Sequence, residues 1–258
     1  MNRDMKEHII ACLNKNVRFD GRKTDEYRNI EFESGLIGTA EGSARVKIGD
    51  TEVLAGVKLS IGTPYPDSPD EGTMSVNTEL LPLASPDFES GPPNIKSIEL
   101  ARIVDRALRE SKLIDTKDLC IEVGEKVWMV SVDVCPINAA GNLFDASFLA
   151  ALLALKDAVY PEYDGETLDY KHKTKKKLPL TDAPVSVTVF KIGEHLIVDP
   201  IPEEEEAIDA RLTVAVLADG RLCALQKGGE LDLTIDQIKE MIKFAVKKSE
   251  EVRKSVKL

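Results

Sequence analysis

Apolar residues recur at helical spacing in two segments in the middle of the chain. Residues 95–113 are amphipathic, and the positions on their apolar face are Leu100, Ile103, Val104, Ala107 and Leu108. Residues 145–159 are apolar almost all round, and Pro161 follows them as a stop signal. This second segment is too short to span a bilayer, so we predict a helix buried between two layers of the fold.

Two further helices are expected near the ends of the chain. Asp4 and Glu7 form a capping signal for a short N-terminal helix. Thr234 and Gln237 form a capping box before a long segment whose apolar residues share one helical face. The second half of the chain is therefore expected to combine strands with a terminal helix.

Short β-rich runs lie between these helices. Gly49 and Asp50 separate two of them as a hairpin turn within residues 29–61, and Gly193 and Ala218 open two later turns. The other runs are residues 74–83, 119–135, 184–192, 195–198, 211–217 and 221–226. The pattern predicts an α+β fold made of two sheet-plus-helix units.

One stretch, residues 160–182, shifts sharply in composition. It is polar, flanked by prolines and rich in lysine, which is typical of a connector between units. We therefore divide the chain into an N-terminal helix and arm at 1–28, a first unit at 29–165, a linker at 166–183 and a second unit at 184–258.

Composition excludes several classes of function. The 258 residues include 34 Lys and Arg against 45 Asp and Glu, a net charge of -11, so the surface as a whole does not attract nucleic acid or anionic lipid. The four cysteines form no CxxC pair, and the three histidines are dispersed, so we expect neither a metal site nor a cofactor. Without an apolar signal core or a membrane span, the protein is expected to be cytoplasmic.

Four blocks carry a family resemblance. The blocks RFDGRKTDEYRNI, IELARIVDRALRES, LCIEVGEKVWMVSVDV and AAGNLFDASFLAALLAL resemble, in order and spacing, the RNase PH family of phosphorolytic exoribonucleases. Within that family the ELAR, GEKVW and GN-x-x-DA runs and the segment VDPIPEEE are most similar to the non-catalytic RNase PH-like subunit of the archaeal exosome. Together these motifs are specific, whereas each alone is weak.

The resemblance implies an RNase PH-like fold, whose N-terminal part is similar to the ribosomal protein S5 domain 2-like fold. It also implies a hexameric ring in which such subunits alternate with catalytic RNase PH-like partners. Cap subunits with S1 and KH domains and single-stranded RNA are the other partners that it implies. In such a ring RNA is shortened from its 3′ end by inorganic phosphate.

The phosphate clamp of active family members is a Gly-Gly-Thr-Arg run before the helix that corresponds to residues 145–159. An arginine at a helix N-terminus holds an anion well. Here the junction from Ala140 to Asp145 has no arginine and places a carboxylate at the helix start. We interpret Asp145 as the N-cap of its helix, which would repel phosphate. No catalytic residue is assigned.

Two acidic residues fall near the family's catalytic carboxylates. Asp209 matches the catalytic aspartate, and Glu203 lies near a second carboxylate position. Without a clamp such an acid cannot run the reaction, so Asp209 is interpreted as a possible vestigial acid. The alternative is a loop of solvated carboxylates before a strand.

Three arginines are the candidate RNA-binding residues. Arg102, Arg106 and Arg109 project along one stripe of the helix predicted at 95–113 and would hold phosphates of a single strand without reading bases. The alternative is neutralisation by Glu99 and Asp105 in ordinary helix pairs. The resemblance favours RNA contact, because the equivalent helix borders the channel.

Other basic and aromatic residues have structural interpretations. The lysines from Lys171 to Lys177 are a second candidate for RNA contact, although a solvated connector explains them better. The family's DGR block contributes Arg18, Arg22 and Arg28, which we interpret as structural ion-pair formers. Trp128 is interpreted as a packing residue.

These features favour a non-catalytic binding and scaffolding subunit that orders a catalytic partner's active site and holds RNA. One alternative is an active phosphorolytic exoribonuclease that uses Asp209 as its acid. Another is a purely structural ring component whose arginines only pair with carboxylates.

Overall fold

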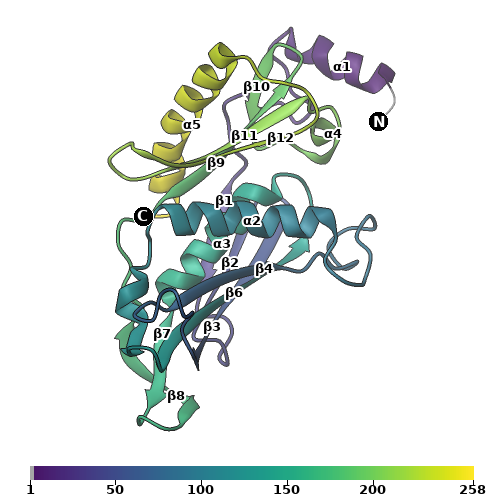
Figure 1. The fold of residues 1–258 in the computed structure, drawn as a ribbon. Coiled ribbons are helices and arrows are strands. Elements are labelled where there is room, and N and C mark those ends of the chain that lie inside the picture. Colours follow the sequence, from purple (N-terminus) through teal and green to yellow (C-terminus); the bar gives the residue numbers. More distant parts are fainter. Residues whose placement is uncertain (1–2) are drawn as a thin grey trace.

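A mixed sheet with two helices on one face makes up the first unit of the computed structural model, which describes residues 3–258 (Figure 1). The strand order is β1-β2-β3-β6-β4, with β5 also paired to β6, and only β4 runs parallel to its neighbour. The elements are β1 (Ile30–Ser34), β2 (Gly42–Ile48), β3 (Thr51–Gly62), β4 (Thr73–Thr78), α2 (Ile95–Glu110), η1 (Thr116–Leu119), β5 (Cys120–Glu122), β6 (Lys126–Asn138) and α3 (Leu143–Asp157). The hairpin turn predicted at Gly49 is confirmed, because Thr51 pairs with Ile48.

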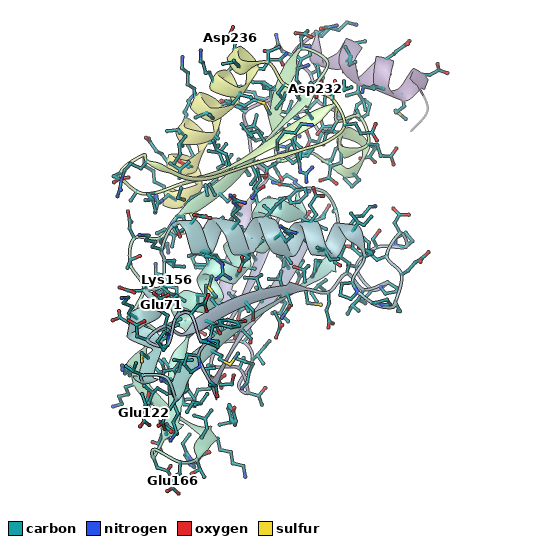
Figure 2. All side chains as sticks on the ribbon, in the orientation of Figure 1. Glu71, Glu122, Lys156, Glu166, Asp232 and Asp236 are labelled. Carbon is teal, nitrogen blue, oxygen red and sulfur yellow. The ribbon has the colours of Figure 1, made fainter. Side chains whose placement is uncertain are left out.

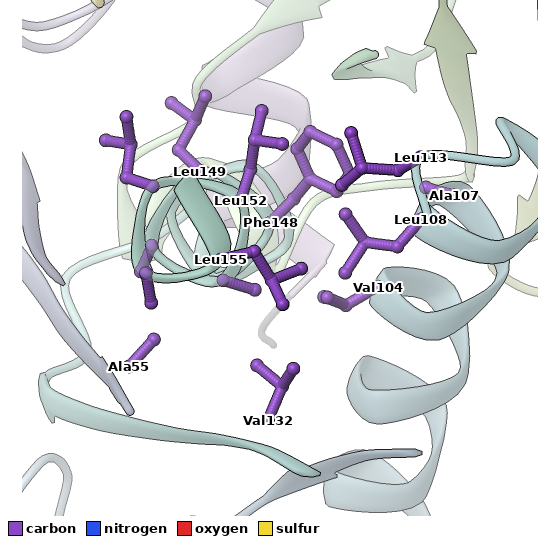
Figure 3. Packing of buried hydrophobic residues seen from close by; sticks show 14 of the residues in the cluster. Ala55, Val104, Ala107, Leu108, Leu113, Val132, Phe148, Leu149, Leu152 and Leu155 are labelled. Carbon is purple, nitrogen blue, oxygen red and sulfur yellow. The ribbon is translucent and has the colours of Figure 1, made fainter. Parts of the chain in front are cut away.

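Helix α3 is the buried centre of the molecule. Every residue from Asp145 to Leu155 is buried. Leu155 points toward Val132 of the sheet and Val104 of α2, whereas Leu149 and Leu152 project from the opposite side of the helix, as Figure 3 shows. A Cβ on Gly42 would lie 2.3 Å from the carbonyl oxygen of Ala154, so glycine is needed for β2 to approach this helix. The prediction of a helix without a polar face, sandwiched between layers, is confirmed.

The second unit is a four-stranded sheet in the order β10-β9-β11-β12, covered on one side by α5. Its elements are β9 (Val185–Ile192), β10 (His195–Val198), α4 (Pro202–Glu205), β11 (Ala210–Val216), β12 (Leu222–Gly228) and α5 (Ile235–Ser255). The capping box of Thr234 and Gln237 is present at the start of α5. The predicted α+β fold of two sheet-plus-helix units is therefore confirmed.

The N-terminal helix belongs to the second unit in space. Helix α1 (Arg3–Leu13) lies beside β10 in Figure 1, and Ile9 and Leu13 form a small core with Phe190, Ile192 and Ile197. From α1 on the second unit, the chain therefore crosses to the first unit and later returns.

The segment predicted as a linker holds regular structure. Strand β8 (Leu168–Lys177) pairs with β7 (Val159–Tyr163) as a separate two-stranded sheet. Pro161, expected to stop the preceding helix, lies within β7, and the helix ends at Asp157. A polar, lysine-rich composition does not exclude an exposed edge strand, because such a strand needs a pairing partner and no buried face. Among the helices of residues 3–258, none is long and apolar enough to cross a bilayer.

Candidate functional site

Helix α2 carries the stripe of arginines. The helix begins at Asn94, whose side chain accepts a 2.9 Å hydrogen bond from the backbone N–H of Ser97. Arg102 is exposed and has no ion-pair partner among residues 3–258. Arg106 lies 4.0 Å from Glu110, at the limit of an ion pair, and both side chains are more than half exposed. Both guanidiniums are therefore open to a phosphate.

Arg109 has a different environment on the same stripe. It pairs with Asp105 at 2.7 Å and donates a second 2.7 Å hydrogen bond to the carbonyl oxygen of Met74 in β4. The hydrogen bonds to Asp105 raise the pKa of the Arg109 guanidinium. Arg109 thus attaches α2 to the edge of the first sheet, and only two of the three predicted arginines are open.

A groove lies between α2 and β12. Its walls include Arg102 and Arg106 on one side and Gln226 and Lys227 on the other. Lys227 donates a 2.7 Å hydrogen bond to the carbonyl oxygen of Gly229, and its side chain stays exposed. The open arginines therefore stand over a surface shared by the two units.

Glu99 pairs across the units and not along its own helix. Its carboxylate lies 2.6 Å from Nη2 of Arg211 in β11, and that guanidinium stacks 4.2 Å over the ring of Phe144. A Cβ on Gly228 would lie 1.8 Å from Nη1, so this glycine makes room for Arg211. The possibility that Glu99 neutralises the arginine stripe is wrong, because Arg211 already engages it. The sequence holds no signal for this contact.

The junction before α3 differs in detail from the prediction. The N-cap is Asn142, in the left-handed conformation at φ 53°, and Asp145 lies in the first turn of the helix. The buried carboxylate of Asp145 accepts hydrogen bonds from the backbone N–H of Thr188 (2.9 Å), the hydroxyl of Tyr27 (2.7 Å) and Nδ2 of Asn142 (3.1 Å). The interpretation of Asp145 as the N-cap is therefore wrong: Asn142 holds that position, and two distant residues, Tyr27 and Thr188, also donate to the Asp145 carboxylate.

Burial dominates the ionisation of Asp145. Desolvation raises the pKa of this carboxyl to about 7, although its hydrogen bonds to Tyr27, Thr188 and Asn142 favour the charged form. The start of α3 therefore presents a buried acid that already accepts three hydrogen bonds, and the backbone N–H of Asn142 before it donates to the carboxylate of Glu205 at 2.7 Å. An incoming phosphate would meet a negative or neutral carboxyl and no guanidinium from this junction.

This acid predicts a pH dependence of stability. The folded state binds the Asp145 proton more tightly than the unfolded chain, whose pKa is about 3.9. The contribution of this carboxyl to the free energy of unfolding is therefore fully present below pH 4 and is lost as the pH rises to about 7. A pKa that is higher by about 3 in the folded state corresponds to about 4 kcal/mol of folding free energy. The Asp145→Asn variant is expected to flatten this decline in urea unfolding measured from pH 4 to 8. A variant with the full wild-type slope would contradict the assignment.

Asp199 is the centre of a buried ion-pair network behind the same junction. It is fully buried and accepts hydrogen bonds from Nη1 of Arg22 (2.8 Å) and from Nε (2.9 Å) and Nη2 (2.7 Å) of Arg28. Asn142 adds a 3.1 Å hydrogen bond from Nδ2. Arg28 also donates hydrogen bonds to the carbonyl oxygens of Ala140 and Gly141. These bonds attach the N-terminal arm to the junction before α3.

Arg18 forms the second buried pair. Its Nε and Nη2 bind the two carboxylate oxygens of Glu204 at 2.9 and 2.5 Å, and both side chains are almost completely buried. Further hydrogen bonds reach the carbonyl oxygens of Val198 and Asp199. The prediction that Arg18, Arg22 and Arg28 are structural ion-pair formers is confirmed.

The carboxylate of the candidate acid Asp209 is bonded to other groups of the protein. Its carboxylate forms an ion pair with Lys6 of α1 and accepts a 2.7 Å hydrogen bond from the backbone N–H of Gly193. Glu203 is exposed on α4, whereas the carboxylates of Glu204 and Glu205 point inward, to Arg18 and to the backbone N–H of Asn142. Asp209 and Asp145 share no bonding partner in these contacts. No group of three or more side chains suited to a metal ion occurs within residues 3–258.

Trp128 packs inside the first unit. Its side chain is buried and makes edge-to-face contacts with the rings of Tyr160 and Tyr163 of β7, at centroid distances of 5.1 and 6.0 Å. The interpretation of Trp128 as a packing residue is confirmed.

Two sheet-plus-helix units joined in this order define the class of the protein. Residues 26–161 match the model of domain 1 of the 3′ exoribonuclease family, and residues 182–248 match domain 2. The chain belongs to this family, the RNase PH family.

Individual relatives are similar over almost the whole chain. "Exosome complex component Rrp42" of Methanopyrus kandleri is 45% identical, with 98% of this chain and 96% of that protein covered. Its counterpart of the same name from Methanocella arvoryzae is 46% identical, at coverages of 97% and 95%. A solved chain of the Archaeoglobus fulgidus exosome, described with RNA bound to the active site, is 43% identical with a TM-score of 0.90 and covers 98% of each chain.

Proposed function

We propose that this protein is a non-catalytic subunit of an archaeal exosome, a complex that shortens RNA from its 3′ end by phosphorolysis. Its role is to scaffold a hexameric ring, to help order the active site of a catalytic RNase PH-like partner and to bind the RNA backbone. Cap subunits with S1 and KH domains complete the complex, which works in the cytoplasm. The similarity to exosome components over nearly the whole chain supports this assignment.

The observation that carries the non-catalytic part is the bonding of Asp145. Active family members are expected to hold phosphate at this helix start with an arginine. In this chain the first turn of α3 holds a buried carboxyl with three hydrogen-bond donors of its own. Phosphorolysis needs a cationic clamp for the attacking anion, and residues 140–145 supply a carboxyl and no arginine.

The binding part of the proposal is supported by α2. Arg102 and Arg106 are exposed and open, and the ion pair of Glu99 with Arg211 and the hydrogen bond from Arg109 to Met74 hold their helix in place. A purely structural subunit would be expected to pair these two arginines with carboxylates. Single-stranded RNA would lie along the groove beside α2, its phosphates held by guanidiniums and its bases unread.

The purified chain is expected to show no phosphate-dependent shortening of single-stranded RNA, whereas a complex reconstituted with its catalytic partner should be active. In that complex Asp209→Asn is expected to leave the rate unchanged, because Asp209 is engaged by Lys6 and Gly193. A general acid contributes about 100-fold or more. Glu203→Gln, on the exposed side of α4, is the matched control.

Two results would contradict the non-catalytic assignment. One is robust turnover by the chain alone. The other is a loss of about 100-fold or more in the complex on Asp209→Asn but not on Glu203→Gln. Urea unfolding of both variants separates loss of an acid from loss of the α1 contact.

A further inference from the structure

The β7–β8 hairpin is the part of the fold that the proposed function does not use. It lies at the end of the first unit away from the second sheet, and its turn contains Glu166 (Figures 1 and 2). Thr174 anchors β8 by donating a 2.7 Å hydrogen bond from its hydroxyl to the carbonyl oxygen of Tyr160. Apart from Thr174 and Leu168, every residue of β8 is exposed.

Strand β8 is bulged twice. Val159 pairs with Lys177 and Pro161 with Lys173, but Glu162 pairs with Asp169, so residues 170–172 oppose no residue of β7. A smaller bulge lies between Lys173 and Lys177. Bulges leave residues unpaired and re-aim their side chains, and they are frequent at binding sites. Here the larger bulge leaves Tyr170, Lys171 and His172 without a partner in the ladder.

The charge of this strand opposes that of the whole chain. Five lysines fall within residues 171–177, in a protein of net charge -11. Lys173 hydrogen-bonds the carbonyl oxygen of Ala40, and Lys176 lies over the ring of Tyr160. Within the described part of the chain, the Nζ groups of the other three have no ion-pair or hydrogen-bond partner: Lys171, Lys175 and Lys177.

An aromatic ring stands among these cations. Tyr170, in the larger bulge, is 45% exposed, and Nζ of Lys58 lies 4.6 Å from its ring centroid. His172, two residues on, lies 2.7 Å from Asp169, which raises the pKa of its imidazole. Interleaved cations and an exposed ring suit single-stranded nucleic acid, because phosphates take the charges and a base stacks on the ring.

We propose that the bulged face of β8, formed by Tyr170, Lys171, His172, Lys175 and Lys177, is a second binding surface for single-stranded RNA, separate from the α2 groove. The proposal rests on the proposed function, since it needs a complex that handles RNA. Lysines and bulges alone would be explained by protection of an exposed strand edge, which uses both. Such protection does not account for the exposed ring of Tyr170, which offers a stacking face to single-stranded RNA.

The test uses a fluorescent 20-nucleotide oligouridylate, with the full chain and with the complex reconstituted with its catalytic partner. Binding is measured by anisotropy over a series of salt concentrations. Lys171→Glu with Lys175→Glu is expected to lower the slope of log K against log salt by about 1.4, at about 0.7 per lost contact. The matched control, Lys239→Glu with Lys243→Glu on exposed positions of α5, changes the charge equally and should keep the wild-type slope.

The aromatic ring of Tyr170 is tested separately. Tyr170→Ala is expected to weaken binding about fivefold or more, and Tyr170→Phe should retain the affinity, since it keeps the stacking face. Arg102→Glu with Arg106→Glu, assayed on the same RNA, reports on the α2 groove alone. Failure of the hairpin variants with a clear effect of the α2 variant would overturn this inference and leave the proposed function standing. A slope that the hairpin variant and its control lower equally would also overturn it.

The competing hypothesis is that the bulged face of β8 binds an acidic protein. Polyglutamate of similar length is added as competitor to the wild-type chain. RNA that is displaced only by unlabelled oligouridylate supports the inference. Displacement by polyglutamate at equal charge concentration would show a surface for acidic peptides and would overturn the assignment to RNA.

Discussion

Replacement of Arg18 by methionine is expected to lower the free energy of unfolding by about 3–5 kcal/mol, the usual effect of removing one partner from a buried ion pair. The carboxylate of Glu204 would stay buried after losing both of its guanidinium hydrogen bonds. The carbonyl oxygens of Val198 and Asp199 would each lose a donor as well. Urea unfolding followed by circular dichroism measures the change.

The control for this prediction is Arg22→Met. Arg22 is also paired with carboxylates, but its partner Asp20 lies near the surface and Arg28 remains to bind Asp199. Its loss is therefore expected to be clearly less destabilising than the loss of Arg18. A second comparison, Arg18→Met combined with Glu204→Met, should recover part of the stability, because no charge is left unpaired. Equal losses for Arg18→Met and Arg22→Met would contradict the role given to the buried pair.

Reversal of charge at Arg102 and Arg106 is the second large effect. If each arginine contacts one phosphate of a single strand, each contributes about 0.7 to the salt slope, or about fivefold in affinity at 0.1 M salt relative to 1 M. Arg102→Glu with Arg106→Glu is then expected to weaken RNA binding at 0.1 M salt by about 25-fold or more. Affinity of the reconstituted complex for single-stranded RNA, measured over a salt series, checks this.

Arg109→Gln provides a contrast within the same stripe. Arg109 is held by Asp105 and by the carbonyl oxygen of Met74, so its loss should affect the attachment of α2 more than RNA affinity. A salt slope unchanged by the double reversal would show that α2 is structural, and the subunit would then act as a spacer in its ring.

Local sequence was sufficient for the helices of the core. The continuous apolar stretch around Leu149 predicted a buried helix, because a segment without a polar face has no stable position on a surface. The alternation of apolar and charged residues likewise predicted α2 with its arginines outward, and the structure has this orientation. Both depend on interactions between residues three or four apart, which a sequence displays directly.

Partners far apart in the chain were beyond this kind of inference. Asp145 looked like an N-cap because a carboxylate at a helix start usually is one. Its donors, Tyr27 and Thr188, come from an N-terminal arm and from the second sheet. Glu99 likewise looked like a partner for its own helix, until β11 brought Arg211 to it.

The sequence by itself determined the two-unit α+β fold, the family, and the absence of an arginine at the junction before α3. These follow from periodicity and motif order, which are local properties of the chain. Tertiary structure decided the other charges: it gave Asp145 and Asp209 partners from distant segments and left Arg102 and Arg106 open, whereas the Arg109–Asp105 pair lies within α2. The physical reason is that an ion pair depends on distance in space, and packing alone brings residues more than a hundred positions apart within 3 Å.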